Sequence, residues 1–187
     1  MKLTYKKKKL TMLIELAKNG DINALEEIIK RVQNHVYAIF AHLVSNKEDV
    51  SDLTQETLIK LAKAIPHLHD INYFNNWLNK IITNTFNDYV RKLPNHFVEL
   101  DEDKLNEIKD KIGCEPGEKC LFSEIEKLIK AALLTLPHDL RITLVLREFE
   151  GLSYEDISKL TNTTLGTVKS RISRARIKLQ NELKEFI

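Results

Sequence analysis

The chain has 187 residues, of which 30% are charged, yet its formal net charge at pH 7 is only +2. This balance excludes a strong uniform field that would draw the whole chain to nucleic acid, so any such binding depends on local clusters of charge. The sequence shows neither a signal-peptide pattern nor an apolar run long enough to span a bilayer, so we expect a cytoplasmic protein without membrane insertion.

Charge is sorted along the chain. Residues 164–178 carry five positive charges and no acid, whereas residues 99–126 hold ten acids against four lysines. The acidic stretch also has few aromatic residues and is punctuated by Gly and Pro, a composition that does not fold alone. We therefore predict a flexible acidic linker at residues 94–121 between two small helical domains, residues 1–93 and 122–187.

The two cysteines, Cys114 and Cys120, lie in this acidic region. No histidine stands near them to complete a metal site, and two thiols in a predicted loop are weak evidence for a disulfide. We assign them no role and expect neither a metal nor another cofactor.

The N-terminal domain opens with a basic run, Lys6–Lys9, whose ordinary explanation is a frayed and solvated end. After it, apolar residues keep helical spacing and predict an all-α domain. Asp21 is placed to cap a long core helix that ends before Ser45. The predicted helices span residues 10–18, 21 to about 44, about 48–65, and 72 or 73 to 92.

The helix predicted at residues 48–65 has an unusual outer face. Its inner side is apolar, and we expect it to bury Val50, Leu53, Leu58, Leu61 and Ile65. The outer side places Ile59 among the acids Asp52 and Glu56, beside Gln55. A solvated face has no use for an exposed isoleucine, whereas a docking face does. Paired carboxylates also allow metal binding or acid–base catalysis, but no histidine or third acid stands at a consistent spacing.

The segment Pro66–Asn72 interrupts the helical pattern and predicts a loop. Two aromatic residues, Tyr73 and Trp77, follow it one helical turn apart. Aromatic side chains beside a polar loop can stack on unpaired bases, each contributing roughly 1–3 kcal/mol. Trp77 can equally fill the core, and we favour that role for it.

The C-terminal domain is predicted to contain a helix over residues 122–134 and another that Pro137 opens in its first turn. We expect the second helix to end at Gly151 and to supply a core of Ile142, Leu144, Val145, Leu146 and Phe149.

The segment that follows has the pattern of a helix-turn-helix. Ser153 is placed as an N-cap with Asp156 at the third helical position, and Leu152 can pack on Ile157 as a hydrophobic staple. A short helix over residues 154–160 is followed by a turn at 161–164 and a longer basic helix. In such motifs the second helix enters the major groove of DNA.

The longer helix has a clear division of faces. An apolar stripe of Val168, Ile172, Ala175 and Leu179 faces inward. The opposite arc carries Lys169, Ser170, Ser173 and Arg174, with Arg171, Arg176 and Lys178 on its flanks. An ordinary solvated face is the alternative, but the cap, staple, turn and one-sided basicity coincide.

Two parts of the chain resemble the extracytoplasmic-function (ECF) group of bacterial RNA polymerase sigma factors, in the sigma-70 family. The run DVSDLTQETLIKLAKAI with YFNNWLNKIITNTFNDYVR is similar to region 2. The run LREFEGLSYEDISKL with LGTVKSRISRAR is similar to region 4. The resemblance implies that residues 1–93 bind core polymerase and the minus-ten promoter element, and that residues 122–187 bind the minus-thirty-five element.

The resemblance also implies roles for individual residues. Those matching the surface that docks on the clamp helices of the polymerase β′ subunit are Asp52, Leu53, Gln55, Glu56 and Ile59. Those matching the pocket for the single-stranded minus-ten element are Lys60, Ala64, His67, Leu68, Ile81 and Asn84, with Asn84 as the hydrogen-bonding residue. The sequence departs from the family at Leu68, often aromatic, and at Asp70, often Gly.

In region 4 the expected contacts fall on two kinds of target. Lys169, Ser170, Ser173 and Arg174 are expected at base edges, because Lys and Arg recognise guanine in the major groove. Arg171, Arg176 and Lys178 are expected at phosphates, which position the protein without specifying sequence.

The resemblance thus implies a dissociable promoter-specificity subunit that is monomeric when free, catalyses nothing, and is controlled by an anti-sigma factor. A stand-alone DNA-binding regulator is one alternative, and dimerisation with tight operator binding would favour it. Another alternative is a helical protein that sequesters a partner and does not act on DNA. Binding that is unaffected when Lys169 and Arg174 are neutralised would favour this alternative. An enzyme is the weakest candidate, because the sequence shows no nucleophile–base, metal or phosphate-loop pattern.

Overall fold

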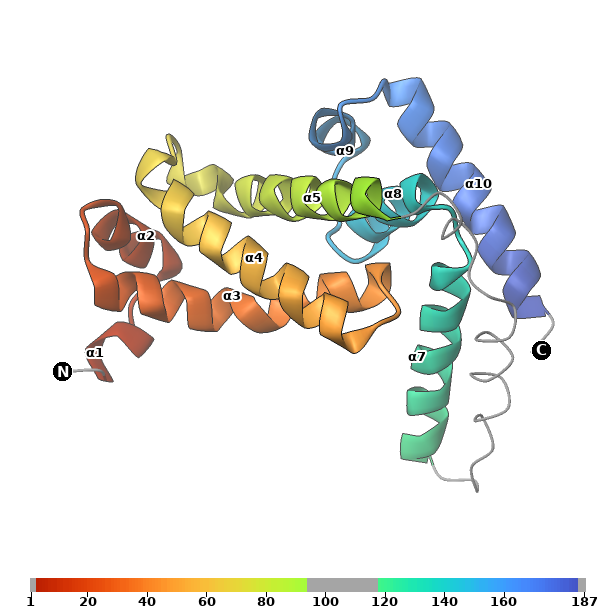
Figure 1. Cartoon of the computed structure of the whole chain (residues 1–187), viewed down its shortest axis with the longest axis horizontal. Helices are drawn as coiled ribbons and strands as arrows, with labels where there is room; N and C mark the ends of the chain where they lie inside the picture. Colours follow the sequence, from red (N-terminus) through yellow and green to blue (C-terminus); the bar gives the residue numbers. More distant parts are fainter. Residues whose placement is uncertain (1–2, 94–117, 185–187) are drawn as a thin grey trace. The chain divides into compact units, whose positions relative to one another are not determined.

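The computed structural model describes residues 3–93 and 118–184, with side chains placed for residues 5–93 and 125–184. These parts of the chain are helical and contain no strand, which confirms the predicted all-α class. The chain divides into two compact units, residues 1–91 and 92–187, which we describe separately (Figure 1). Residues 94–117 of the predicted linker, including Cys114, lie outside the described residues. The side chain of Cys120 also lies outside them.

Unit 1 is built around one long helix, α3. Its elements are α1 (Leu3–Lys6), α2 (Leu10–Lys18), α3 (Ile22–Leu43), α4 (Lys47–Ala64), the short 3-10 helices η1 (Ile65–His67) and η2 (Ile71–Tyr73), and α5 (Phe74–Lys92). Both α2 and α4 pack against α3 (Figure 1). Asp21 caps α3 as predicted, since its Oδ1 accepts hydrogen bonds from the backbone N–H groups of Asn23 and Ala24.

The buried face of α4 differs from the predicted one in which residues it contains. Val50, Leu53 and Leu61 are buried as expected, but Leu58 is only half-buried. Thr54 and Thr57 are buried instead and complete the stripe at helical spacing. The hydroxyl of Thr54 donates to the Val50 carbonyl at 2.7 Å, so its burial leaves no unmet hydrogen bond.

Unit 2 is built around α8, whose middle is buried on every side. Its elements are α7 (Glu118–Leu134), α8 (His138–Glu148), α9 (Tyr154–Thr161) and α10 (Leu165–Lys184). All residues from 140 to 146 are buried, because α9 and α10 both pack on α8. Helix α7 starts at Glu118, four positions before the predicted start at 122, so the expected linker boundary is too late.

The end of α8 corrects two further expectations. Pro137 is the N-cap of α8 and does not lie within its first turn. Phe149 is 45% exposed and contributes little to the core in which it was expected. Gly151 has a φ of +63°, the left-handed conformation typical of a helix stop, but it lies two residues after the C-cap Phe149.

Candidate nucleic-acid and partner interfaces

Helix α10 presents the basic face that the sequence predicts. Val168, Ile172 and Ala175 are buried against the unit, and Leu179 is half-buried. The side chains on the opposite arc that are exposed to solvent are Lys169, Ser170, Ser173, Arg174, Arg176 and Lys178. Among the residues of α10 that are predicted to contact DNA, Arg171 is the exception, because its side chain on the flank of the helix is half-buried.

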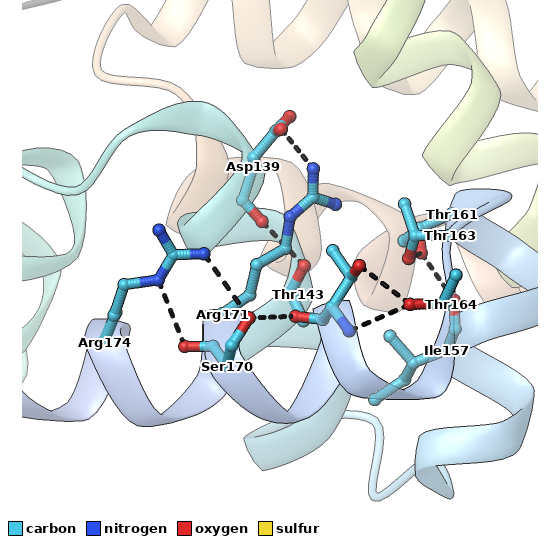
Figure 2. Close-up of polar contacts among 10 residues, drawn as sticks. Asp139, Thr143, Ile157, Thr161, Thr163, Thr164, Ser170, Arg171 and Arg174 are labelled. Carbon is cyan, nitrogen blue, oxygen red and sulfur yellow. Dashed lines mark hydrogen bonds and ion pairs between the residues drawn. The ribbon is translucent and has the colours of Figure 1, made fainter.

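The first turn of α10 is held by a short series of hydroxyl contacts (Figure 2). Thr164 caps the helix, since its Oγ1 accepts a hydrogen bond from the Thr167 backbone N–H at 3.1 Å. The Ser170 hydroxyl donates to the Thr167 carbonyl at 2.9 Å. One turn on, the Arg174 Nε lies 3.3 Å from the Ser170 carbonyl and its Nη2 lies 3.4 Å from the Ser170 Oγ. These long contacts lay the exposed guanidinium along the outer face of the helix.

Two of the arginines expected at phosphates are paired with acids of α8. Arg171 Nη2 donates to Asp139 Oδ2, and Figure 2 shows the guanidinium turned toward that carboxylate. The Arg171 side chain is 17% exposed, so this pair is partly sheltered from solvent. Arg176 Nη2 lies 2.6 Å from Glu148 Oε1, but here both side chains are about half exposed, at 56% and 44%. The two pairs brace α10 on α8, and the second is the more easily exchanged for a phosphate.

The first helix of the motif is fixed as predicted. The Ser153 Oγ accepts a hydrogen bond from the Asp156 backbone N–H at 3.0 Å, and Leu152 and Ile157 are both buried. The Arg147 guanidinium lies 4.9 Å from the centre of the Tyr154 ring, and its Nη1 donates to the Leu152 carbonyl at 2.7 Å. Arg147 therefore holds the entry to α9 from both sides, a contact that the sequence analysis missed.

The turn between α9 and α10 depends on Asn162. This residue has a φ of +52° and a ψ of 44°, the left-handed conformation that Asn tolerates better than most residues. It is the C-cap of α9. Together with the Thr164 cap it sets the direction in which α10 leaves the turn.

In unit 1, the outer face of α4 brings together most residues predicted to dock on a partner. Asp52, Gln55, Glu56, Ile59, Lys60 and Lys63 line one shallow hollow of the surface. Ile59, one of these lining residues, is 54% exposed, as expected, and Leu53 is buried behind the face. Carboxylates around an exposed apolar side chain suit a partner surface that carries arginines and an apolar contact.

Lys60 connects this face to α5. Its Nζ lies 2.8 Å from Glu56 Oε1, 3.1 Å from Thr85 Oγ1 and 3.6 Å from Asp88 Oδ2. Burial by itself would raise the pKa of Asp88, but hydrogen bonds and charge from Arg91 and Lys60 outweigh it and hold that pKa below its usual value. The predicted minus-ten lysine is thus part of an ion network that joins α4 to α5.

The loop between α4 and α5 is more firmly held than its sequence suggests. Leu68 is only 4% exposed, and its carbonyl accepts a hydrogen bond from Lys18 Nζ. The burial leaves the Leu68 side chain little surface for the minus-ten pocket, where the resemblance places it. Asp70 caps η2 by accepting a hydrogen bond from the Asn72 backbone N–H at 2.9 Å. Both departures from the family pattern therefore have structural reasons.

The remaining residues predicted for the minus-ten element differ in exposure. His67 and Asn84 are exposed, whereas Ala64 and Ile81 are half-buried. Beside them Tyr73 is 63% exposed. Trp77 is half-buried, with its ring 5.9 Å from that of the buried Phe74, which agrees with the core role favoured for it.

The described residues offer no metal site, since they contain no group of three or more His, Cys, Asp or Glu side chains that could hold an ion. Within the same residues, each helix is too short or too polar to cross a bilayer.

Comparisons with known families match both units. Residues 28–94 match the description "Sigma-70 region 2", and residues 126–179 match "Sigma-70, region 4". The chain is 35% identical over 184 residues to an ECF RNA polymerase sigma-E factor of Haemophilus influenzae, covering 94% of this chain and 95% of that protein. It is 32% identical over 183 residues to the RNA polymerase sigma-H factor of Pseudomonas aeruginosa, covering 94% of each.

Solved structures show the same likeness in three dimensions. The sigma factor RpoE of Bartonella quintana, crystallised with the anti-sigma factor NepR, matches with a TM-score of 0.65 at 26% identity, over 87% of this chain and 98% of that one. CnrH, solved with the cytosolic domain of CnrY, matches in fold with a TM-score of 0.65 at 20% identity, over 94% and 97%.

Proposed function

This chain belongs to the extracytoplasmic-function sigma factors of the sigma-70 family, and from that premise we propose how its surfaces start transcription. It is a sigma factor that directs promoter-specific transcription initiation. The main support for the roles of individual surfaces is that one chain presents two surfaces of different character. Unit 1 presents the acidic face of α4 around Ile59, and unit 2 presents the basic face of α10.

The face of α4 is the docking site for core RNA polymerase. Asp52 and Glu56 pair with arginines of the β′ clamp helices, and exposed Ile59 supplies the apolar contact at the centre. Gln55 adds hydrogen bonds at the edge, while Leu53 supports the face from inside the unit. This surface carries the factor to the enzyme but contributes no chemistry to RNA synthesis.

The melted minus-ten element lies along the exposed side of α5 and the loop before it. A base extruded from the stack needs an amide for its edge and an aromatic or apolar wall. Asn84 supplies the amide, His67 and Lys60 approach the backbone, and half-buried Ala64 and Ile81 form the wall. Tyr73, which is more exposed than these, takes the stacking role that buried Leu68 cannot fill.

The minus-thirty-five element is recognised by α10 in the major groove. Lys169, Ser170, Ser173 and Arg174 contact base edges, and Lys178 contacts a phosphate. Arg171 mainly braces the helix through Asp139, while Arg176 can exchange its exposed pair with Glu148 for a phosphate. Because few phosphates are neutralised, the free chain binds DNA weakly, and polymerase raises the effective concentration of each unit at its own element.

The likeness to RpoE, solved with the anti-sigma factor NepR, supports control of this chain by an inhibitor of the same class. Since its partners in this proposal are core polymerase and promoter DNA, the chain acts in the cytoplasm. It does so as a monomeric, non-catalytic subunit.

Charge reversal on α4 tests the docking proposal. Changing Asp52→Lys together with Glu56→Lys places like charges opposite the expected arginines, so capture by immobilised core polymerase should fall at least tenfold. The matched control changes Glu15→Lys and Glu26→Lys, two acids of unit 1 outside this face, and should bind as the unaltered chain does. Normal capture of the first double variant would remove the α4 face from the proposal.

A further inference from the structure

The basic run at the start of the chain is held in place, contrary to the expectation of a frayed end. Lys6 closes the short helix α1, and Lys7–Lys9 lead into α2. A single side chain of α3, Arg31, fixes this turn. Its Nη1 donates to the Lys8 carbonyl at 2.9 Å, and its Nη2 donates to the carbonyls of Tyr5 and Lys6 at 3.1 and 2.9 Å.

Two more contacts secure the same segment. The Nε of Arg31 donates to Glu27 Oε1 at 2.9 Å, which holds the guanidinium in the plane that reaches the three carbonyls. The Tyr5 hydroxyl donates to Asp21 Oδ2 at 2.8 Å. The segment is therefore fastened to Asp21 and to the N-terminal half of α3 by charge-assisted hydrogen bonds before and within the lysine run.

The arrangement concentrates positive charge without neutralising it. Lys6, Lys7 and Lys9 are exposed, and no ion pair joins any of them to an acid within residues 5–93. Lys8 is half-buried, and its Nζ lies 5.9 Å from the centre of the Tyr5 ring and 3.9 Å from the Met12 sulfur. Holding neighbouring ammonium groups together costs repulsion, which an arriving polyanion would relieve.

We propose that Lys6, Lys7 and Lys9 form an additional binding surface for the phosphate backbone of duplex DNA. Lysine ammonium groups are compact point charges that suit phosphates without requiring a base sequence. The run itself presents only lysine side chains to solvent. The choice of DNA over an acidic protein surface rests on the proposed function, in which unit 1 lies on promoter DNA.

The test uses the full chain and a fluorescent duplex of arbitrary sequence, without polymerase. The variant Lys6→Gln, Lys7→Gln, Lys9→Gln removes the three exposed charges and leaves Lys8 packed on Tyr5. Each lost phosphate contact lowers the slope of log affinity against log salt by about 0.9. The variant should lack all three contacts. Raising the salt from 50 to 200 mM should therefore weaken DNA binding by the unaltered chain about 40-fold more than DNA binding by the variant.

The matched control removes three exposed lysines elsewhere, Lys30→Gln and Lys47→Gln in unit 1 and Lys92→Gln at the boundary between the two units. It should keep the salt slope of the unaltered chain. Equal slopes for all three proteins, or equal losses in both variants, would overturn the proposal. So would a variant that binds DNA normally but loses core polymerase, because the partner would then be an acidic protein surface. None of these outcomes touches the docking role of α4, which is measured separately.

The part played by Arg31 has its own readout. The change Arg31→Lys keeps the charge but cannot donate to three carbonyls at once. Trypsin should then cleave after Lys6–Lys9 several-fold faster than in the unaltered chain, relative to cleavage after Lys184 in the same digest. Equal rates would show that the lysine run is not held by Arg31, and the fixed surface proposed here would be wrong.

Discussion

Arg171 and Arg174 lie three residues apart on α10, yet their surroundings differ. Arg171 is 17% exposed and donates to Asp139 of α8. Arg174 is exposed and makes only long contacts with Ser170 of its own helix. A side chain bound to its own domain stabilises the position of the helix, whereas one that lies loosely on the surface is available to a base. One turn of helix thus contains both a brace and a candidate for sequence recognition.

Replacing Arg174 with Ala should change promoter choice while leaving polymerase binding intact. An Arg contact to a guanine edge contributes about 1–3 kcal/mol of discrimination, or roughly 5- to 150-fold at one base pair. Transcription from a library randomised in the minus-thirty-five element measures this directly. Arg171→Ala is the internal comparison, and it should lower the melting temperature without altering base preference. The same altered preference in both variants would contradict the division of roles.

His138 gives unit 2 a pH dependence. Burial lowers its pKa, and the charge of Arg141 lowers it further. A histidine whose folded pKa lies below the unfolded value of about 6.5 is destabilising when protonated. The contribution of neutral His138 to the stability of unit 2 is therefore complete above pH 6.5 and is lost as the pH falls through the folded pKa.

Comparison with His138→Gln isolates this effect from the other histidines. Between pH 7.5 and 5.0 the free energy of unfolding should fall more steeply for the unaltered chain than for the variant. The acids with shifted pKa values, Asp21 and Asp88, are both lowered from an ordinary value of 3.8, so they titrate below this range. Parallel pH profiles would show that the burial of His138 has no effect on stability.

At the level of elements, local signals predict most of the helices. Asp21 and Ser153 cap their helices as expected, because a cap depends on residues two or three positions away. Errors arise where a contact comes from far along the chain or where polar residues are buried. Thr57 is fully buried although its type suggests exposure, and Phe149 is exposed although its type suggests burial.

Features of the candidate sites could be predicted from the sequence where they depend on neighbouring residues of one helix. The faces of α4 and α10 follow from helical spacing alone, and the structure places their side chains as that spacing requires. Arg171 pairs with Asp139, which lies 32 positions away in the sequence. Arg31 contacts the lysine run from about 25 positions away. No local pattern predicts such contacts, and they decide which cations remain available to DNA.

The cap of α9 offers a test at this scale. Ser153→Ala removes the hydroxyl that accepts from the Asp156 backbone N–H, so it should destabilise unit 2 by about 1 kcal/mol. The loss is measured by denaturant unfolding, with Ser51→Ala as the control, since that serine is exposed within α4. Equal stability of the two variants would show that the cap does not stabilise the motif.

For the molecule as a whole, function depends on two compact units with different surfaces in one chain. Unit 1 combines the acidic α4 face with the exposed side of α5, and unit 2 carries the basic face of α10. Under the proposed function each unit alone binds DNA weakly, and polymerase holds both units on a promoter. This explains why a chain with a net charge of only +2 can act on nucleic acid.

Run-off transcription with purified core RNA polymerase on a library of promoter fragments tests this account most directly. With the chain added, we expect transcripts to start from a restricted set of fragments that share a minus-ten and a minus-thirty-five sequence. Transcripts indistinguishable from those of core polymerase alone would contradict the account, however well the chain binds DNA by itself.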